Sequence, residues 1–498
     1  MSTKAEVPRG VDVADRFRDD SYPLIFERSS PGRRAARPPL VAGPQMAELL
    51  GEEHLRAAPP RLPEVAELDL VRHYTQLAHR QFSIDGNVYP LGSCTMKYNP
   101  KLHEDVAARF QDVHPYQDEG SAQGILTILA ELQDDLATLT GMHRVSLQPA
   151  AGAHGELAGI LMIRSYHEAR GEGEQRRVVI CPDGAHGTNP ATASMAGYDV
   201  VEVPTGPDGE VDLDAFRQAL GPHVAAVMLT NPNTLGIFET RILEISDAAH
   251  AVGAQLYYDG ANLNAIVGRA RPGDMGFDVV HLNLHKTFTT PHGGGGPGTG
   301  PVGVQEHLSP YLPFPLLVRR DDGSVAIEPP RHTAIGRLRS FYGNVGNLVR
   351  AWAYIRTLGT SGLRRVATMA VLNANYLRVR MREAGYRIAF DRVNMHEFVA
   401  QPPEGVRTLD LAKMMLDYGV HPMTVYFPLI VREAMMVEPT ETESLETLDA
   451  YAAVLAQILR DAQADPESAR AAPHATPVRR LDEVAAARRP VLRYRAPA

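Results

Sequence analysis

The sequence predicts an α/β protein whose large domain is built on a mostly parallel central sheet and is followed by a smaller C-terminal α+β domain. Two observations support this fold class. Between residues 145 and 284, runs rich in β-branched residues alternate with amphipathic helical patterns, as they do where crossover helices connect parallel strands. After about residue 345 the alternation ends, and long helical patterns lead into short strand-like runs.

Composition excludes several other classes of protein. Of the 498 residues, 44% are hydrophobic and 22% are charged, which is typical of a globular protein with a sizeable core. The net charge of -9 argues against nucleic-acid binding, and no run approaches the ~20 apolar residues of a membrane helix. The chain has only two cysteines, Cys94 and Cys181, and no apolar signal core at its N-terminus. We therefore expect a cytoplasmic protein without a disulfide framework or a metal cluster.

Residues 1–115 are expected to form an N-terminal arm and a helical segment. Residues 1–63 are rich in proline and arginine, which favours an extended arm that could lie over another subunit. A helix is predicted at 63–79, before a turn-rich stretch at 87–100 that reads NVYPLGSCTMKYNP.

Residues 116–345 are predicted to form the large domain. Its strands are expected at 177–181, 199–203, 224–230, 254–258 and 277–284. Its helices are expected at 119–140, 155–170, 212–220 and 241–252, and Gly253 follows the last of them as a C-cap.

Residues 346–462 are predicted to form the small C-terminal domain, and residues 463–498 a surface tail rich in alanine, proline and arginine. The helices of the small domain are expected at 347–358, 363–384, 408–416 and 444–461, and its strands at 386–390 and 397–400.

Lys286 is the residue around which a candidate site can be built. It ends an apolar strand-like run and precedes four glycines at 293–296, whose backbone can approach a ligand closely. A lysine amine directed into a cleft at a strand end can form a Schiff base. The alternative is a strand-terminal lysine before a flexible loop.

Asp259 complements this lysine from the preceding predicted strand. In open α/β sheets, ligands bind outside the carboxyl ends of the strands, where both residues are expected. Pyridoxal 5'-phosphate requires such a pair, because a lysine binds its aldehyde and a carboxylate keeps its pyridine nitrogen protonated. Taken alone, Asp259 is more typical of a turn or an N-cap, and it is the combination with Lys286 that favours a cofactor site. Further polar residues follow the predicted strands: His186, Thr188, Asn189, Asn231, Asn233, Asn262 and His285.

The segment 150–156, AAGAHGE, predicts a cradle for the phosphate. Small residues lead into a predicted helix, and the free N–H groups of a helix start bind anions. His154 could stack on the cofactor ring, or it could be a hydrogen-bonded histidine at a helix start. His281 and His285 are four residues apart, but they lie in a strand-like run without a zincin glutamate, so we expect no metal site.

Longer blocks carry a resemblance to a known family. They are YPLGSCTMKYNP, LQPAAGAHGELAG, AHGTNPATASMAG, YYDGANLNAI, HLNLHKTFTTPHGGGGPG and FPLIVREAMMVEPTETESLETLDAY, between about residue 80 and residue 450. Together they resemble the pyridoxal-phosphate glycine decarboxylase family, the P-protein of the glycine cleavage system. Single-chain P-proteins are roughly twice as long, and this chain resembles their carboxyl-terminal half, the β subunit (subunit 2) of the two-subunit form.

The resemblance implies roles for individual residues. Lys286 looks like the lysine that binds the cofactor covalently, and Asp259 like the partner of the pyridine nitrogen. Gly152 and Ala153 would cradle the phosphate, with His154 stacked on the ring. The same resemblance places four further residues at the site, namely His186, Thr188, Asn262 and His285. It also implies that the glycine run at 293–296 helps to bind phosphate across a subunit interface.

The resemblance further implies a fold, an activity and partners. The fold would be that of the PLP-dependent transferases of fold type I, which is aspartate-aminotransferase-like. The activity would be that of glycine dehydrogenase (aminomethyl-transferring): glycine loses CO2 and its aminomethyl group passes to the lipoyl arm of H-protein. A P-protein α subunit would complete an α2β2 heterotetramer. The alternatives are another fold type I enzyme, such as an aminotransferase or amino-acid decarboxylase, and a non-catalytic scaffold subunit.

Overall fold

A seven-stranded sheet forms the centre of the large domain in the computed structural model, which describes residues 22–36, 43–58, 60–292, 298–340 and 343–493. The strand order is β1-β7-β6-β5-β4-β2-β3. The bounds are β1 Arg144–Ser146, β2 Val178–Pro182, β3 Asp199–Val203, β4 Val224–Thr230, β5 Gln255–Gly260, β6 Val279–Leu282 and β7 Val302–Val304. Strands β2 to β6 pair in parallel, whereas β7 runs antiparallel to both β1 and β6. The predicted mostly parallel sheet is confirmed.

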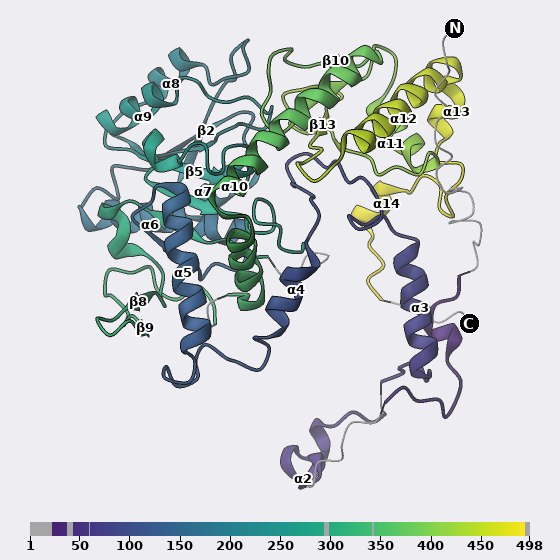
Figure 1. Ribbon diagram of the computed structural model, residues 1–498, viewed down its shortest axis with the longest axis horizontal. Helices are drawn as coiled ribbons and strands as arrows, with labels where there is room; N and C mark the ends of the chain where they lie inside the picture. The colour runs from purple at the N-terminus through teal and green to yellow at the C-terminus, as the bar shows by residue number, and fades with distance from the viewer. Residues whose placement is uncertain (1–21, 37–42, 59, 293–297, 341–342, 494–498) are drawn as a thin grey trace.

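Helices cover both faces of this sheet, and strands β4 and β5 are therefore wholly buried (Figure 1). Alternate residues of a strand face opposite layers: Tyr257 and Val279 pack with helices α6 and α7, and Tyr258 and Val280 pack with α5, α9 and α10. The helices of the large domain are α5 Gln123–Thr140, α6 Gly152–Ala169, α7 Thr188–Met195, α8 Leu213–Ala219 and α9 Ile242–Ala251. A hairpin, β8 Leu317–Arg319 and β9 Val325–Ile327, packs on α5.

Helix α10, Val345–Glu383, joins the two domains. Its first half packs on α5, where Trp352 Nε1 donates a hydrogen bond to Glu131 Oε2 at 2.8 Å. Gly359 interrupts the helix with φ 60° and ψ -174°, and Leu377 lies in the core of the small domain. The two helices predicted at 347–358 and 363–384 thus lie on either side of this kink in α10.

The small domain contains an antiparallel sheet in the order β10-β11-β13-β12. Its strands are β10 Arg387–Ile388, β11 Phe398–Gln401, β12 Thr424–Val425 and β13 Met435–Val437, and its helices are α11 Thr408–Asp417, α12 Leu445–Ala464 and α13 Pro466–Ala471. The structure differs from the surface tail predicted after residue 463, because α13 packs on α11 and α12 and buries Ala469 and Ala472.

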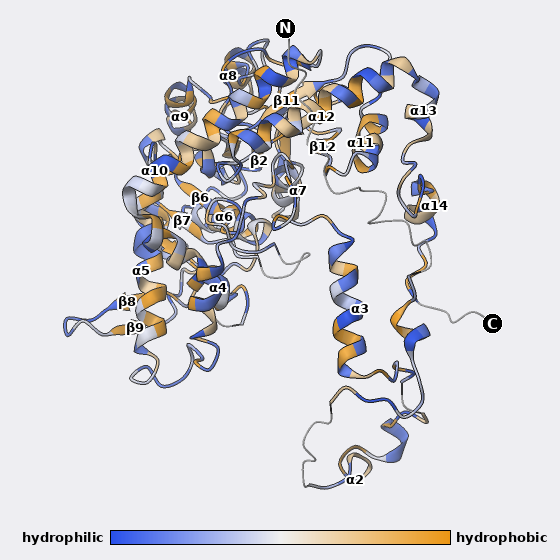
Figure 2. Ribbon diagram, turned by 45° about the vertical axis from the view of Figure 1, so that its right-hand side comes forward, coloured by the Kyte–Doolittle hydropathy of each residue, from blue (hydrophilic) through white to orange (hydrophobic). Residues whose placement is uncertain are grey.

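An arm extends away from both domains (Figure 1). It carries α2 Met46–Leu50 and α3 Glu67–His79, and α14 Glu483–Arg488 also lies outside the body of the molecule. Figure 2 shows apolar residues along α3, where Leu68 and Val71 are 57% and 55% exposed. Helix α4, Lys101–Ala108, returns the chain to α10. Among the described helices, none is both long and apolar enough to cross a bilayer.

Candidate active site

Strands β5 and β6 bring Asp259 and Lys286 to the same edge of the sheet. Asp259 is opposite His281 in the β5–β6 ladder, and the chain turns after β6 so that Lys286 N donates to Asn283 O at 2.9 Å. Asp259 is buried, whereas Lys286 is partly exposed. The amine therefore lies where a ligand can reach it, at the carboxyl ends of the strands.

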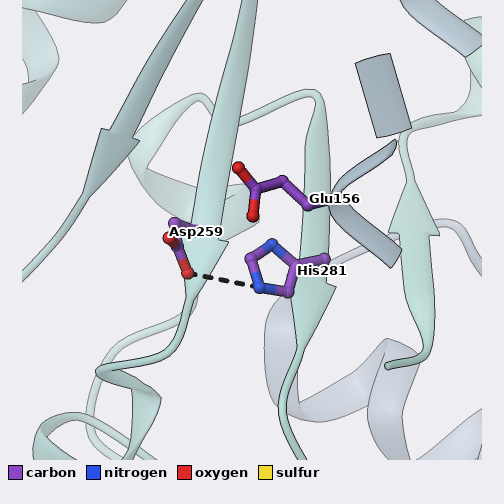
Figure 3. Close-up of side chains that lie close together, drawn as sticks. All are labelled: Glu156, Asp259 and His281. Carbon is purple, nitrogen blue, oxygen red and sulfur yellow. Dashed lines mark ion pairs between the residues drawn. The ribbon is translucent and has the colours of Figure 1, made fainter. Parts of the chain in front are cut away.

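The Asp259 carboxylate is held by a set of fixed donors. Its Oδ1 accepts from Ala261 N at 2.9 Å and lies 3.3 Å from His281 Nε2. The Asn189 amide, oriented with its nitrogen toward the carboxylates, donates to Asp259 Oδ2 at 3.1 Å and to Glu156 Oε1 at 2.7 Å. Figure 3 shows Glu156, Asp259 and His281 converging from α6, β5 and β6.

Glu156 is a buried acid that we did not predict. Burial and the neighbouring Asp259 raise the pKa of Glu156 to about 8, so its carboxyl is neutral at pH 7. The signal for it in the sequence is the spacing of Gly152, Gly155 and Gly159, because glycines at this spacing mark a helix face that packs closely on a sheet. A Cβ at Gly159 would lie 2.4 Å from the Tyr257 ring. Glu156 belongs to that buried face.

His281 supports Asp259 from the neighbouring strand. Burial lowers the pKa of this histidine, so the imidazole is neutral. Its Nε2 lies 3.3 Å from Asp259 Oδ1 and 3.0 Å from Asn283 Nδ2, and its Nδ1 lies 2.7 Å from Tyr257 OH. Ligand atoms of Glu156, Asp259 and His281 lie within 4.8 Å of one another, as metal ligands do. Each of these side chains already has hydrogen-bond partners, however, which favours a role in holding Asp259.

The phosphate cradle predicted from the sequence falls at the start of α6. The helix begins at Gly152, three residues before its predicted start, and no side chain caps it. A Cβ at Gly152 would lie 2.0 Å from Asn283 Oδ1, so only glycine fits. Ala153 is exposed, and His154 is half-buried with Nδ1 accepting from Ala150 N at 3.3 Å. The free N–H groups of this helix start suit a phosphate.

The other predicted residues surround the same edge. His186 Nδ1 lies 2.8 Å from Thr188 Oγ1, and the Thr188 hydroxyl contacts the Glu156 carboxyl at the start of α7. Asn262 is buried and donates to Pro232 O at 2.9 Å and to Glu397 Oε1 at 3.2 Å. The structure thus brings these residues together from several elements.

Buried polar atoms without a protein partner gather near Lys286. Within the described part of the chain they include Asn262 Oδ1, His285 Nδ1, Thr287 Oγ1, Thr290 Oγ1 and His292 Nε2. Burial, and then the Lys286 ammonium, lower the pKa of His285 to about 3. Unpartnered buried groups are costly, so this set fits a polar ligand such as a phosphorylated cofactor. The glycine run at 293–296 lies outside the described residues.

A stretch of the N-terminal segment completes the site between the domains. Leu91 pairs with Val437 beside β13. Lys97 is fully buried, with Nζ 2.8 Å from Asn264 Oδ1 and 2.8 Å from Glu441 Oε1. This segment therefore contacts both domains and fixes their relative position next to the site.

Comparison with known proteins places the chain in a family. The glycine cleavage system P-protein model matches residues 63–323, and the model of the glycine dehydrogenase C-terminal domain matches residues 366–479. A probable glycine dehydrogenase (decarboxylating) subunit 2 of Thermus thermophilus is 64% identical over 475 residues, which cover 95% of this chain and 99% of the relative. The corresponding protein of Caldanaerobacter subterraneus is 54% identical and covers 95% of this chain and 98% of its own length.

Solved structures agree with this at the level of fold. Glycine decarboxylase (P-protein) of the glycine cleavage system, in inhibitor-bound form, superposes with a TM-score of 0.70 at 22% identity, covering 83% of this chain and 94% of that structure. A sphingosine-1-phosphate lyase of Burkholderia pseudomallei has a TM-score of 0.61 at 18% identity, covering 84% and 94%. The fold is therefore that of the PLP-dependent transferases of fold type I. High identity over almost the full length shows that the chain belongs to the glycine dehydrogenase (decarboxylating) subunit 2 family, the P-proteins of the glycine cleavage system.

Proposed function

We propose that this chain is the cofactor-carrying subunit that decarboxylates glycine and passes the aminomethyl group to the lipoyl arm of H-protein. One observation carries the proposal: Lys286 and Asp259 lie at adjacent strand ends, beside buried polar atoms that have no hydrogen-bond partner among the described residues. A scaffold subunit would need neither residue in this arrangement. The family membership fixes the reaction class that this geometry serves.

The residues of the site fit pyridoxal 5'-phosphate. Lys286 would bind it covalently, Asp259 would face its pyridine nitrogen, and the N–H groups at Gly152 and Ala153 would hold its phosphate, with His154 against the ring. When bound, the cofactor supplies an electron sink for the electron pair of the bond that releases CO2. His186, Thr188, Asn262 and His285 would line the same site.

The neighbours of Asp259 hold its carboxylate in place, and Glu156 beside it keeps its own proton. Hydrogen bonds from Ala261 N and from the Asn189 amide fix the Asp259 carboxylate, and His281 Nε2 lies 3.3 Å from it, so that it can keep a pyridine nitrogen protonated. Because Glu156 is neutral, its carboxyl adds no second negative charge beside Asp259. Such fixed groups stabilise developing charge without reorganisation.

Glycine, lipoylated H-protein and a P-protein α subunit are the proposed partners, the last in an α2β2 heterotetramer. Apolar side chains on the arm support a partner subunit, because Leu49, Leu62, Leu68 and Val71 are all more than half exposed. Both cysteines are free thiols, which supports a cytoplasmic location.

Replacing Lys286 tests the proposal. We expect borohydride to fix pyridoxal 5'-phosphate covalently on wild-type protein, on the peptide that contains Lys286. Lys286→Ala should lose this cofactor adduct. It should also lose the glycine–CO2 exchange measured with lipoylated H-protein and the α subunit. Lys413→Ala, on α11, is the matched control. Exchange at the wild-type rate in Lys286→Ala would refute the assignment. Activity with 2-oxo acids and independence of H-protein would instead indicate another fold type I enzyme.

A further inference from the structure

Two glutamates face each other beside the proposed site. In the β11–β13 ladder Phe398 is opposite Val437, which places Glu397 and Glu438, the next residues of this antiparallel pair, opposite each other. Both are completely buried, at 0% exposure. Like charges directly opposite each other across two strands are destabilising, so this pair needs an explanation.

Backbone and amide donors occupy three of the four carboxyl oxygens. Glu397 Oε2 accepts from Ser93 N at 2.7 Å, and Glu438 Oε2 accepts from Thr95 N at 2.8 Å. Glu397 Oε1 accepts from Asn262 Nδ2 at 3.2 Å. The fourth oxygen, Glu438 Oε1, has no hydrogen-bond partner among the described residues.

His396 adds two more unpartnered atoms to this cluster. Its Nε2 lies 3.8 Å from Glu438 Oε1, and neither ring nitrogen has a hydrogen bond within the described chain. Burial, and then Lys286 and Lys97, lower the pKa of His396 to about 3, so the ring is neutral. Ligand atoms of His396, Glu397 and Glu438 lie within 4.8 Å of one another, as metal ligands do, but in the described part of the chain donors already occupy three of the four carboxyl oxygens.

One proton remains on the pair at neutral pH. Burial and the facing Glu438 raise the pKa of Glu397 well above its usual range. Burial also raises the pKa of Glu438 to about 7, although hydrogen bonds from Thr95 and the Lys286 charge oppose the rise. Oxygen atoms of the two carboxyls lie within 4.8 Å of each other, and two ionised carboxylates this close in a buried site are unfavourable, which a shared proton relieves.

The pair belongs to the site rather than to the core of the small domain. The charge of Lys286 affects the ionisation of both glutamates, and Asn262, three residues after Asp259, donates to one of them. The other charged or titratable groups that affect the pair are Cys94, His396 and Glu441. The pair thus lies within electrostatic reach of the lysine that would hold the cofactor.

We propose that Glu397 and Glu438 form a carboxyl–carboxylate pair that acts as the acid of this site, delivering its proton to the sulfur released from the lipoyl disulfide. This inference rests on the proposed function. The aminomethyl carbon forms a bond to one sulfur, the S–S bond breaks, and the other sulfur leaves with the electron pair. That thiolate takes the proton of the pair and becomes a thiol, and the two glutamates are then both ionised until solvent returns a proton.

The pKa of a thiol is close to the raised pKa of the glutamate pair, which supports the lipoyl thiolate as the acceptor of the proton. A free thiol has a pKa of about 8.5, and a carboxyl whose pKa is raised toward that value transfers its proton to a thiolate at little cost in free energy. Cys94 does not compete as a nucleophile, because burial raises the pKa of its thiol. Ser93 and Thr95, on either side of it, have φ of 65° and 47°, a region that the two glutamate contacts help to stabilise.

Isosteric variants test the role of the pair. Glu397→Gln and Glu438→Gln keep an acceptor for the loop N–H groups but carry no transferable proton. Glu443→Gln is the matched control, since burial also raises the pKa of Glu443 to about 7 but Glu443 is not one of the two facing carboxyls. The readouts are glycine–CO2 exchange with lipoylated H-protein and the α subunit, its pH profile, cofactor absorbance, and the infrared C=O stretch of protonated carboxyls.

We expect both glutamine variants to bind cofactor normally but to exchange CO2 about 10²–10⁴-fold more slowly. They should also lose the alkaline limb of the pH profile and part of the protonated-carboxyl signal. Glu438→Asp retains a titrating carboxyl and should therefore keep the alkaline limb, moved to a different pH. A purely structural role of Glu438 would not move this limb. Wild-type rates or an unchanged alkaline limb in the glutamine variants would overturn the inference.

Two further outcomes are separable. If the glutamine variants do not fold, absence of a protonated-carboxyl signal in the wild type at pH 7 overturns the inference directly. If the wild type itself shows no exchange, the proposed function fails and this inference fails with it. An active wild type with unaffected variants removes the inference alone.

Discussion

Glu156 and Asp259 show how two buried carboxyls beside one cofactor site can have different charges. Asp259 accepts from a backbone N–H and faces an imidazole, whereas Glu156 contacts hydroxyl groups and the Asn189 amide. Burial and the charge of Asp259 keep Glu156 neutral. The environment of Glu156, rather than its residue type, decides that its carboxyl is neutral.

The raised pKa of Glu156 predicts how stability depends on pH. The folded pKa of about 8 exceeds the unfolded value near 4.3. Between these values the folded state binds more protons, so the contribution of Glu156 to stability falls as pH rises. Glu156→Gln does not titrate, and its stability relative to wild type should increase from about pH 5 to about pH 8, by at most about 1.4 kcal/mol per pH unit.

Urea unfolding across this pH range measures the effect. Glu174→Gln, at a fully exposed side chain, is the control and should show no such trend. A difference between Glu156→Gln and wild type that does not vary with pH would contradict a neutral Glu156. Cofactor absorbance of the same variant should remain that of wild type, because Gln keeps the contact to the Asn189 amide.

The position of Lys286 and Asp259 at one edge of the sheet was predictable from the sequence, because each follows an apolar strand. Their roles toward a cofactor stay a prediction. Glu156, Glu397 and Glu438 were not predictable, since a glutamate in a helix or beside a short strand usually lies on the surface. Only the packing of α6 on the sheet and the β11–β13 register show that they are buried.

At the scale of elements, the kink in α10 depends on one glycine. Gly359 has φ 60° and ψ -174°, a conformation that other residues rarely adopt, and no atom would obstruct a Cβ there. Gly359→Ala should therefore destabilise the protein through backbone strain alone, by roughly 1–3 kcal/mol. Gly124→Ala, in the first turn of α5 and equally unobstructed, should be neutral or stabilising by up to about 1 kcal/mol.

Thermal unfolding of the two variants under identical conditions gives the comparison. If both alanines change the melting temperature equally, the kink does not depend on the glycine conformation. If only Gly359→Ala lowers the melting temperature, the kink depends on the backbone conformation of this glycine.

Prediction of elements succeeded where a pattern was long enough to repeat. Strands β3 and β4 have the bounds expected from the sequence, and the break in α10 at Gly359 falls between the helices expected at 347–358 and 363–384. The three-residue strands β1 and β7 were not predicted, because so few residues show no alternation. Their antiparallel pairing is a property of the folded sheet.

At the scale of the whole molecule, a close approach positions the small domain against the large one. Gly236, with φ 73°, follows β4, and a Cβ there would lie 1.8 Å from Glu397 O. Met395 N donates to Gly236 O at 2.6 Å. This contact places the end of β11 at the edge where Asp259 and Asn262 lie, so the two domains together form the site.

The exposed apolar residues of the arm predict dependence on a partner. Leu68→Ser on α3 should weaken binding of the α subunit by about 1.5–3 kcal/mol, the value of burying one leucine, without changing the melting temperature of the isolated chain. Leu243→Ser, on α9 and 60% exposed, is the control. Titration calorimetry or gel filtration of the mixture measures this, and equal binding by both variants would exclude α3 from the interface.

The contact between α10 and α5 gives the molecule a built-in optical reporter. Trp352 is the only tryptophan in the chain, and its indole is fixed against Glu131 in the large domain. Its fluorescence therefore follows the loosening of that domain, whereas circular dichroism follows all helices at once. Non-coincident melting curves from the two signals would show that the domains unfold in separate steps, and coincident curves that they unfold together.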